Sequence, residues 1–248
     1  MTEDLHTNAQ SDPKSDQLSD LNAAPLNRLP GAVWLLLLVV IGVEAVFQLA
    51  ALGVIGGAQG IGWRIGAIQR FGYSSSVQDW MMNNRAFPPM HLLRYATFSF
   101  IHGTLMHALF VCVLIAALGK AVAEAFGGIR FLVLALVVPV IAAVIFGLVL
   151  GADQTGWLIG GMPMAFALVG GFTWLKWTQA AGDVEKQRRA FAMIGLLLVA
   201  RLAFGLMAEA GPAWIAEVAA FALGFGLSAT GLGPGSWRAL RARLRGRG

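Results

Sequence analysis

The chain has 248 residues, of which 57% are hydrophobic and only 12% are charged. A soluble globular domain carries about twice this fraction of charged residues, so the composition argues against an ordinary soluble protein. The single cysteine, Cys112, excludes a disulfide framework and a metal site built from several cysteines. Lys and Arg outnumber Asp and Glu by 18 to 13, and the placement of these residues is more informative than the net charge of +5.

The first 30 residues are predicted to form a disordered cytoplasmic tail. They are rich in Asn, Asp, Ser, Gln and Pro, and they hold five acidic residues but only two basic ones, Lys14 and Arg28. A signal peptide begins with a short basic region and has a shorter apolar core than the segment that follows here. We therefore expect the first apolar segment to be retained as a membrane span.

Six apolar segments follow, and each is long enough to cross a bilayer core of about 30 Å as a helix. Lipid offers no partners for free backbone groups, so helices are expected. The sequence predicts an all-α, polytopic six-helix membrane domain over residues 31–233. The predicted spans cover about 32–52, 95–118, 131–152, 154–175, 190–208 and 212–232.

The basic residues predict the orientation of this domain. With six spans, both termini share one side, which receives 13 of the 18 basic residues. Both termini are therefore expected in the cytoplasm, with the domain in a bacterial inner membrane. The arginine-rich tail, residues 234–248, is interpreted as an anchor on anionic lipid, because no nucleic-acid-binding motif accompanies it. The 13 residues are Lys14, Arg28, Lys120, Arg130, Lys176, Lys186, Arg188, Arg189 and the arginines at 238, 241, 243, 245 and 247.

The first external loop, residues 53–91, is unusually long and has its own apolar periodicity. Arg64 and Arg70 lie off the apolar stripe, which predicts a short amphipathic helix lying in the headgroup zone. Residues 77–82 are a second helical candidate, ended by Pro88 and Pro89. The stripe consists of Ile61, Ile65, Ile68 and Phe71.

Three segments carry a resemblance to a known family. Residues 91–124 read HLLRYATFSFIHGTLMHALFVCVLIAALGKAVAE, residues 157–174 read WLIGGMPMAFALVGGFTW, and residues 214–227 read WIAEVAAFALGFGL. In this order they resemble the second, fourth and sixth helices of the rhomboid intramembrane serine proteases. The resemblance covers about residues 95–232, and the long amphipathic loop also matches it.

Further positions add to the resemblance. Arg94 and Tyr95 resemble the Trp-Arg segment of the family, with Leu93 in place of the Trp. Gly119 and Glu124 resemble the family's Gly-x-x-x-Glu pattern, shifted by one residue. The resemblance implies a six-helix rhomboid fold.

The residues that carry rhomboid chemistry are replaced. The family cleaves peptide bonds with a Ser-His dyad, and its serine lies in a Gly-x-Ser-Gly turn. Met162 stands at the serine position and Glu217 at the histidine position, and a thioether cannot form a stable acyl-enzyme. The resemblance places an oxyanion-binding pair at His107, which is retained, and at Val111, where an Asn is expected. A rhomboid pseudoprotease is therefore implied.

We expect the former active site to bind transmembrane helices of other membrane proteins, besides membrane lipids, without cofactor, metal or nucleic acid. Two alternatives are a structural accessory subunit of a membrane complex and an active protease with an atypical site. The expected binding residues are His102, His107, Gly160, Gly161, Met162, Phe166 and Glu217.

Ionisable residues inside predicted spans need partners, because an isolated charge there is costly. Arg201 and Glu217 lie at compatible depths in adjacent segments, so a structural ion pair is predicted, with Glu44 as a rival partner for Arg201. On one continuous helix, His102 and His107 would point about 140° apart, which argues against a shared metal.

Overall fold

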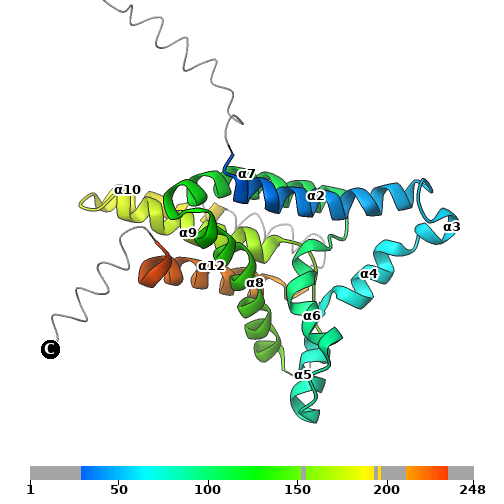
Figure 1. Ribbon diagram of the computed structural model, residues 1–248. Helices are drawn as coiled ribbons and strands as arrows, with labels where there is room; N and C mark the ends of the chain where they lie inside the picture. The colour runs from blue at the N-terminus through cyan, green and yellow to red at the C-terminus, as the bar shows by residue number, and fades with distance from the viewer. Residues whose placement is uncertain (1–28, 152–154, 193–194, 197–210, 234–248) are drawn as a thin grey trace, which may run out of the picture.

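A computed structural model of the chain describes residues 29–151, 155–192, 195–196 and 211–233 (Figure 1). The two predicted tails lie almost entirely outside this part, as does most of the predicted span 190–208, including Arg201. Within the described part, four helical segments are long and apolar enough to cross a membrane. The total of six spans therefore stays a prediction. The four are α2 (Gly31–Ala51), α7 (Leu105–Phe126), α8 (Gly128–Leu150) and α12 (Trp214–Leu227) extended by the π-helical turn η2 (Ser228–Leu232).

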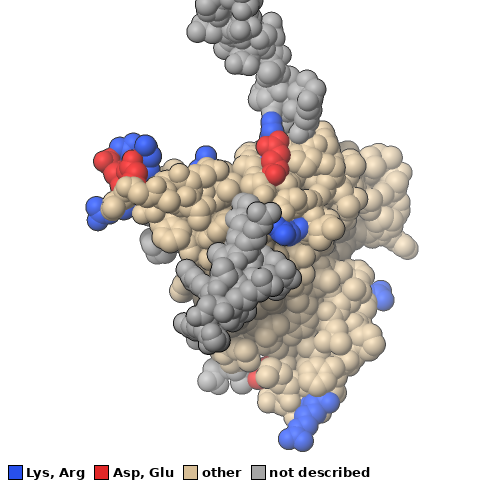
Figure 2. Space-filling view, turned by 60° about the vertical axis from the view of Figure 1, so that its left-hand side comes forward, with Lys and Arg blue, Asp and Glu red and all other residues tan. Residues whose placement is uncertain are grey.

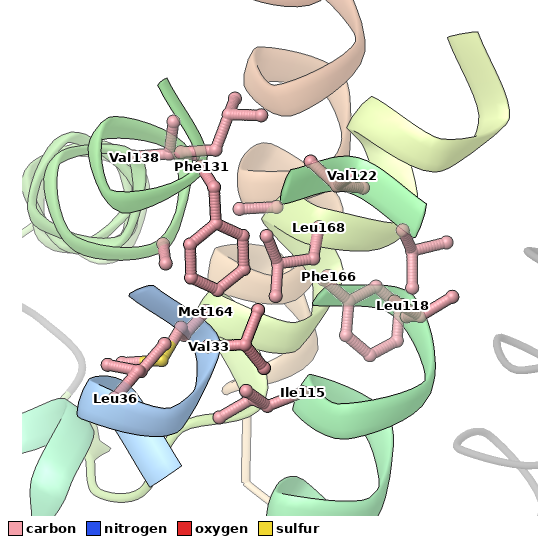
Figure 3. Close-up of a cluster of buried hydrophobic side chains, with 14 of the residues drawn as sticks. Val33, Leu36, Ile115, Leu118, Val122, Phe131, Val138, Met164, Phe166 and Leu168 are labelled. Carbon is pink, nitrogen blue, oxygen red and sulfur yellow. The ribbon is translucent and has the colours of Figure 1, made fainter. Parts of the chain in front are cut away.

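Helix α9 (Met162–Gln179) lies at the centre of the bundle, and 13 of its 18 residues are buried. Figure 3 shows its side chains Met164, Phe166 and Leu168 among side chains of α2, α7 and α8. A central helix contacts protein on all sides, so it has no need of a continuous lipid-facing apolar surface. The core of the protein is therefore built around α9, the helix whose first residue, Met162, belongs to the predicted site.

The long loop between α2 and α7 folds into short elements that lie to one side of the bundle (Figure 1). The predicted helix around residues 61–71 is present as α4, and the second candidate lies within α5. These elements are α3 (Gly57–Gly60), α4 (Trp63–Phe71), strand β1 (Tyr73–Ser74), α5 (Ser75–Asn84), α6 (Pro89–Thr97) and the 3-10 turn η1 (Phe98–Phe100).

The predicted span 95–118 differs from the structure at both ends. The chain leaves the helical conformation over residues 101–104, and α7 begins only at Leu105 and continues to Phe126. Thr104 causes the restart, because its hydroxyl accepts a hydrogen bond from the His107 amide over 3.2 Å, as an N-cap residue does. The apolar segment 95–118 therefore contains a helix boundary, and its position is marked by the capping residue Thr104.

The predicted span 154–175 also begins too early. Residues Trp157 and Leu158 form strand β2, which pairs antiparallel with β1, and α9 starts at Met162 and ends at Gln179. Pro163 suits the first turn of a helix, where its missing N–H is not needed. The apolar residues Trp157 and Leu158, which precede it, form a strand instead of a helix.

The surface is suited to lipid over a broad area. In Figure 2, charged side chains are few and most lie toward the edges of the face shown, and most of the remaining visible surface is uncharged. One charged group belongs to α10 (Val184–Ala190), where the Lys186 amide donates to the Asp183 carboxylate and holds the pKa of that carboxyl below its usual range. Exposed Leu and Val side chains on α2 and α8 fit contact with acyl chains.

A buried amide joins the external loop to α8. The hydroxyls of Tyr73 and Tyr95 both donate to the Gln78 side-chain oxygen, over 2.9 and 2.8 Å, and Gln78 Nε2 donates to the Val144 carbonyl over 3.1 Å. Burial raises the pKa of the Tyr73 phenol well above its usual range. One side chain therefore satisfies the hydroxyls of the buried Tyr73 and the half-buried Tyr95 and anchors α5.

Replacing Gln78 by Leu is expected to loosen the loop. Two hydroxyls lose their acceptor, which costs about 2 kcal/mol or more in the free energy of unfolding. Hydrogen exchange over residues 72–84 should rise. Asn83→Leu is the control, because Asn83 lies on the same helix and its side chain donates a solvent-exposed hydrogen bond to Asp79 over 2.9 Å. Equal exchange in the two variants would contradict the expectation.

Candidate functional site

The turn that precedes α9 is fixed to the external loop. Strand β2 pairs Leu158 with Tyr73 and Trp157 with Ser74. Beyond the strands, the Ser75 amide donates to the Gly156 carbonyl over 2.9 Å, and the Gly156 amide donates to the Ser75 hydroxyl over 2.8 Å. These bonds join residues about 80 positions apart, so the geometry of the site depends on the loop.

Gly160 and Gly161 form the turn itself. Gly160 has φ +84°, a left-handed conformation that glycine adopts without steric cost. Its amide donates to the Phe98 carbonyl over 2.8 Å, and the Gly161 amide donates to His102 Nε2 over 3.2 Å. Both amides are thus engaged by the protein, and neither points freely at a ligand.

Met162 is the first residue of α9 and is 9% exposed. It belongs to an apolar cluster with Val111 of α7 and with Phe166, which lies one turn along α9 and is buried. A Cβ added at Gly161 would lie only 2.7 Å from Val111 Cγ1, so the turn packs directly on α7. The surroundings of Met162 are therefore apolar.

The two histidines meet in space. His102 is fully buried in the stretch before α7, whereas His107 lies in the first turn of that helix. Their ring centroids are 5.2 Å apart in an edge-to-face arrangement. The predicted divergence of about 140° is wrong, because it assumed one continuous helix through both residues. A side chain at Gly160 would collide with the His107 ring, so both histidines line the turn.

Glu217 is buried on α12 at 1% exposure. Gly224 lies against the backbone of Ala167, and the Ser228 hydroxyl faces Gly171, so α9 and α12 run in the same direction. Glu217 precedes Gly224 by seven residues, which is about two helical turns. It therefore lies near the level at which α9 begins. Its predicted partner Arg201 lies outside the described residues, and that ion pair stays a prediction.

Glu44, the rival partner of Arg201, is held by a different arginine. Arg64 of α4 forms an ion pair with it over 2.7 Å, and Gln48 Nε2 donates to the same carboxylate over 2.7 Å. Sequence reasoning missed this pair. The available signal was an arginine off the apolar stripe of the loop, together with an acidic residue inside an apolar span.

The residues that the structure describes hold no cluster of three or more His, Cys, Asp or Glu side chains that would bind a metal ion. Cys112 is a half-buried free thiol on α7, packed against the apolar cluster. The described site is an apolar cluster at the start of α9 with two imidazoles beside its turn, and the buried carboxyl group of Glu217 lies near the same level on α12.

A comparison with protein-family models decides the family. The Rhomboid domain matches residues 89–234, from α6 through η2. The chain belongs to the rhomboid family. The match spans more than half of the chain and includes every segment of the candidate site. No curated protein matches the chain.

Membership places this rhomboid in the membrane. Together with the four apolar helices, it makes the chain an integral membrane protein. The turn at Gly160 and the helix that starts at Met162 lie within the rhomboid domain. Met162 and Glu217 are thus part of a rhomboid domain.

Proposed function

We propose that this protein is a rhomboid pseudoprotease that binds transmembrane helices of other membrane proteins. The observation that carries the proposal is Met162 at the start of α9, in the position that the resemblance assigns to the nucleophile. No Ser, Thr or Cys occurs between residues 157 and 171. In serine hydrolases, losing the nucleophile or the base alone lowers the rate by roughly a millionfold.

The hydrogen bonds of the turn support the same proposal. Acyl transfer needs N–H donors aimed at the developing oxyanion. The Gly160 amide is engaged by Phe98, and the Gly161 amide is engaged by His102. Val111, which replaces the expected Asn, is fully buried and apolar. Neither amide is therefore free to supplement His107 at an oxyanion.

The apolar cluster at the site supports helix binding. Met162, Val111 and Phe166 form a buried cluster of thioether, aliphatic and aromatic side chains, and methionine adapts to partners of varied shape. A transmembrane helix brings apolar side chains and has no free backbone donors or acceptors. This apolar cluster suits such a partner better than it suits a polar ligand. We further propose that the protein resides in a bacterial inner membrane with both termini in the cytoplasm.

Photo-cross-linking from position 162 in native membranes tests the binding proposal. A photoreactive residue there should yield adducts with intact single-span membrane proteins, identified by mass spectrometry. The same residue at Val137, which is exposed on α8, is the control for random neighbours in the bilayer. Adducts only with lipid, or the same adducts from both positions, would contradict helix binding.

A cleavage assay tests the inactivity. The wild type and the single variants Met162→Ser and Glu217→His are each expected to give no cleavage of a membrane-embedded fluorogenic substrate, because each lacks at least one member of the dyad. An active rhomboid serves as the positive control. Cleavage by the wild type that disappears in Glu217→Ala or His107→Ala would replace the pseudoprotease with a protease that uses an atypical site.

A further inference from the structure

The guanidinium of Arg64 links three segments of the chain. Its Nη1 and Nη2 atoms donate to the two carboxylate oxygens of Glu44 on α2, over 3.0 and 2.7 Å. Nη1 also donates to the backbone carbonyl of His102 over 2.6 Å. Arg64 thus joins the external loop, α2 and the stretch that precedes α7 at one point.

The ion pair lies in a largely apolar environment. The Glu44 side chain is 6% exposed and the Arg64 side chain 18%. Glu44 precedes the last residue of α2 by seven positions, about 10 Å along the helix axis. The guanidinium also stacks over the Phe47 ring, 5.0 Å from its centroid. A buried pair of this kind favours one arrangement of its segments more than it adds stability.

Helix α4, which carries Arg64, has few other attachments. None of its nine residues is buried. Its far end is held by α6, because the Thr97 hydroxyl donates to the Phe71 carbonyl over 2.8 Å and Arg94 donates to the Gly72 carbonyl over 3.0 Å. Arg64 lies near the other end. The helix is therefore a strap pinned at both ends.

One residue, His102, links the Arg64 end of this strap to the candidate site by hydrogen bonds. His102 accepts from Arg64 with its backbone carbonyl and from the Gly161 amide with its ring nitrogen. Met162 follows Gly161 directly. Two hydrogen bonds therefore connect the loop to the backbone at the start of α9.

We propose that Arg64 is a positioning residue that keeps this site closed. Its bonds to Glu44 and His102 hold α4 against α2 and keep the His102 ring on the Gly161 amide. Loss of these bonds releases the first part of α4 and opens the start of α9 to small reagents. The consequence for client helices rests on the proposed function, whereas the consequence for access to position 162 does not.

Thiol labelling in the full-length protein tests this inference. Cys112→Ala removes the native thiol, and Met162→Cys supplies a single reporter. In native membranes, Arg64→Ala is expected to raise the rate of labelling by a small, membrane-permeant maleimide about tenfold or more. The reason is that breaking a buried ion pair shifts the equilibrium strongly from the closed site to the open one. Arg64→Lys keeps the charge but loses the bidentate geometry. Its labelling rate should lie between that of the protein with Arg64 and that of Arg64→Ala.

Two controls separate a local opening from general loosening. Arg70 lies on the same helix, and its guanidinium stacks over its own neighbour Phe71 at 5.7 Å, so Arg70→Ala should leave the labelling rate unchanged. A second reporter, Thr173→Cys, lies buried eleven residues along α9 and should stay protected in Arg64→Ala. If Arg64→Ala does not fold, the double variant E44L/R64M leaves no unpaired charge and should show the same opening.

The outcomes are distinct. Equal labelling of position 162 in Arg64→Ala and Arg70→Ala would overturn the inference, and so would a rise at position 173 as large as that at 162. Faster labelling in Arg64→Ala with no client adducts from the wild type would support the strap and overturn the proposed function alone. Client adducts from the wild type with unchanged labelling in Arg64→Ala would overturn the strap alone.

Discussion

Gly224→Ala is expected to destabilise the protein by about 1–3 kcal/mol or more, although it adds one methyl group. A Cβ at this position would overlap the backbone of Ala167 on α9, and a backbone atom cannot move without moving its helix. Close approach of two helices through small residues is a principal source of packing in membranes. The loss should appear in the free energy of unfolding measured in detergent micelles.

Gly226→Ala is the matched control for this prediction. Gly226 lies two residues further along α12, and no atom of the residues that the structure describes lies within 4 Å of a Cβ added there. Alanine favours the helix over glycine by about 0.5–1 kcal/mol, so this variant should be equally or more stable than the wild type. Two chemically identical substitutions should therefore have opposite signs. If both variants destabilise equally, the close contact of α9 and α12 is not what Gly224 provides.

Gly160→Ala is expected to destabilise the protein and to displace His107 from the site. The residue has φ +84°, where a side chain costs about 1–2 kcal/mol, and the added methyl group would also collide with the His107 ring. The combined loss should be about 3 kcal/mol, since the collision adds an overpacking cost. Unfolding measurements, together with the imidazole resonances of His107, would record both effects.

Gly182→Ala separates the two causes. Gly182 has φ +95°, but within the described part of the chain nothing lies within 4 Å of a Cβ added there. This variant should lose only the backbone contribution, about 1–2 kcal/mol, and should leave the His107 resonances unchanged. The difference between the two variants then reports the collision alone. No difference would mean that the turn can shift away from His107.

The residues of the candidate site were named from the resemblance of their segments to rhomboid motifs. Met162, Val111 and Glu217 were assigned in this way, and their roles stay predictions. The structure adds what surrounds them. It shows that His102 bonds the Gly161 amide and that Gly160 bonds Phe98. Such contacts join residues some 60 positions apart, and no local pattern encodes them.

Helix boundaries were predicted less well than helix existence. The apolar run from Tyr95 to Leu118 has the composition of one span, yet Thr104 restarts the helix within it. The run before Met162 is also apolar, yet Trp157 and Leu158 pair with the loop as a strand. Hydropathy measures the preference for lipid or a core, and it does not distinguish a helix from a strand buried in protein.

The sequence by itself determined that this is a membrane protein and which family it resembles, because apolar length and a few dispersed motifs suffice for each; the role of Met162 at the nucleophile position stays a prediction. Only the tertiary structure decided which charges meet. Arg64 pairs with Glu44 because α4 folds back along α2, 20 residues after the carboxylate. A buried charge accepts whichever partner the fold brings within reach, and this reach is set by packing rather than by distance along the chain.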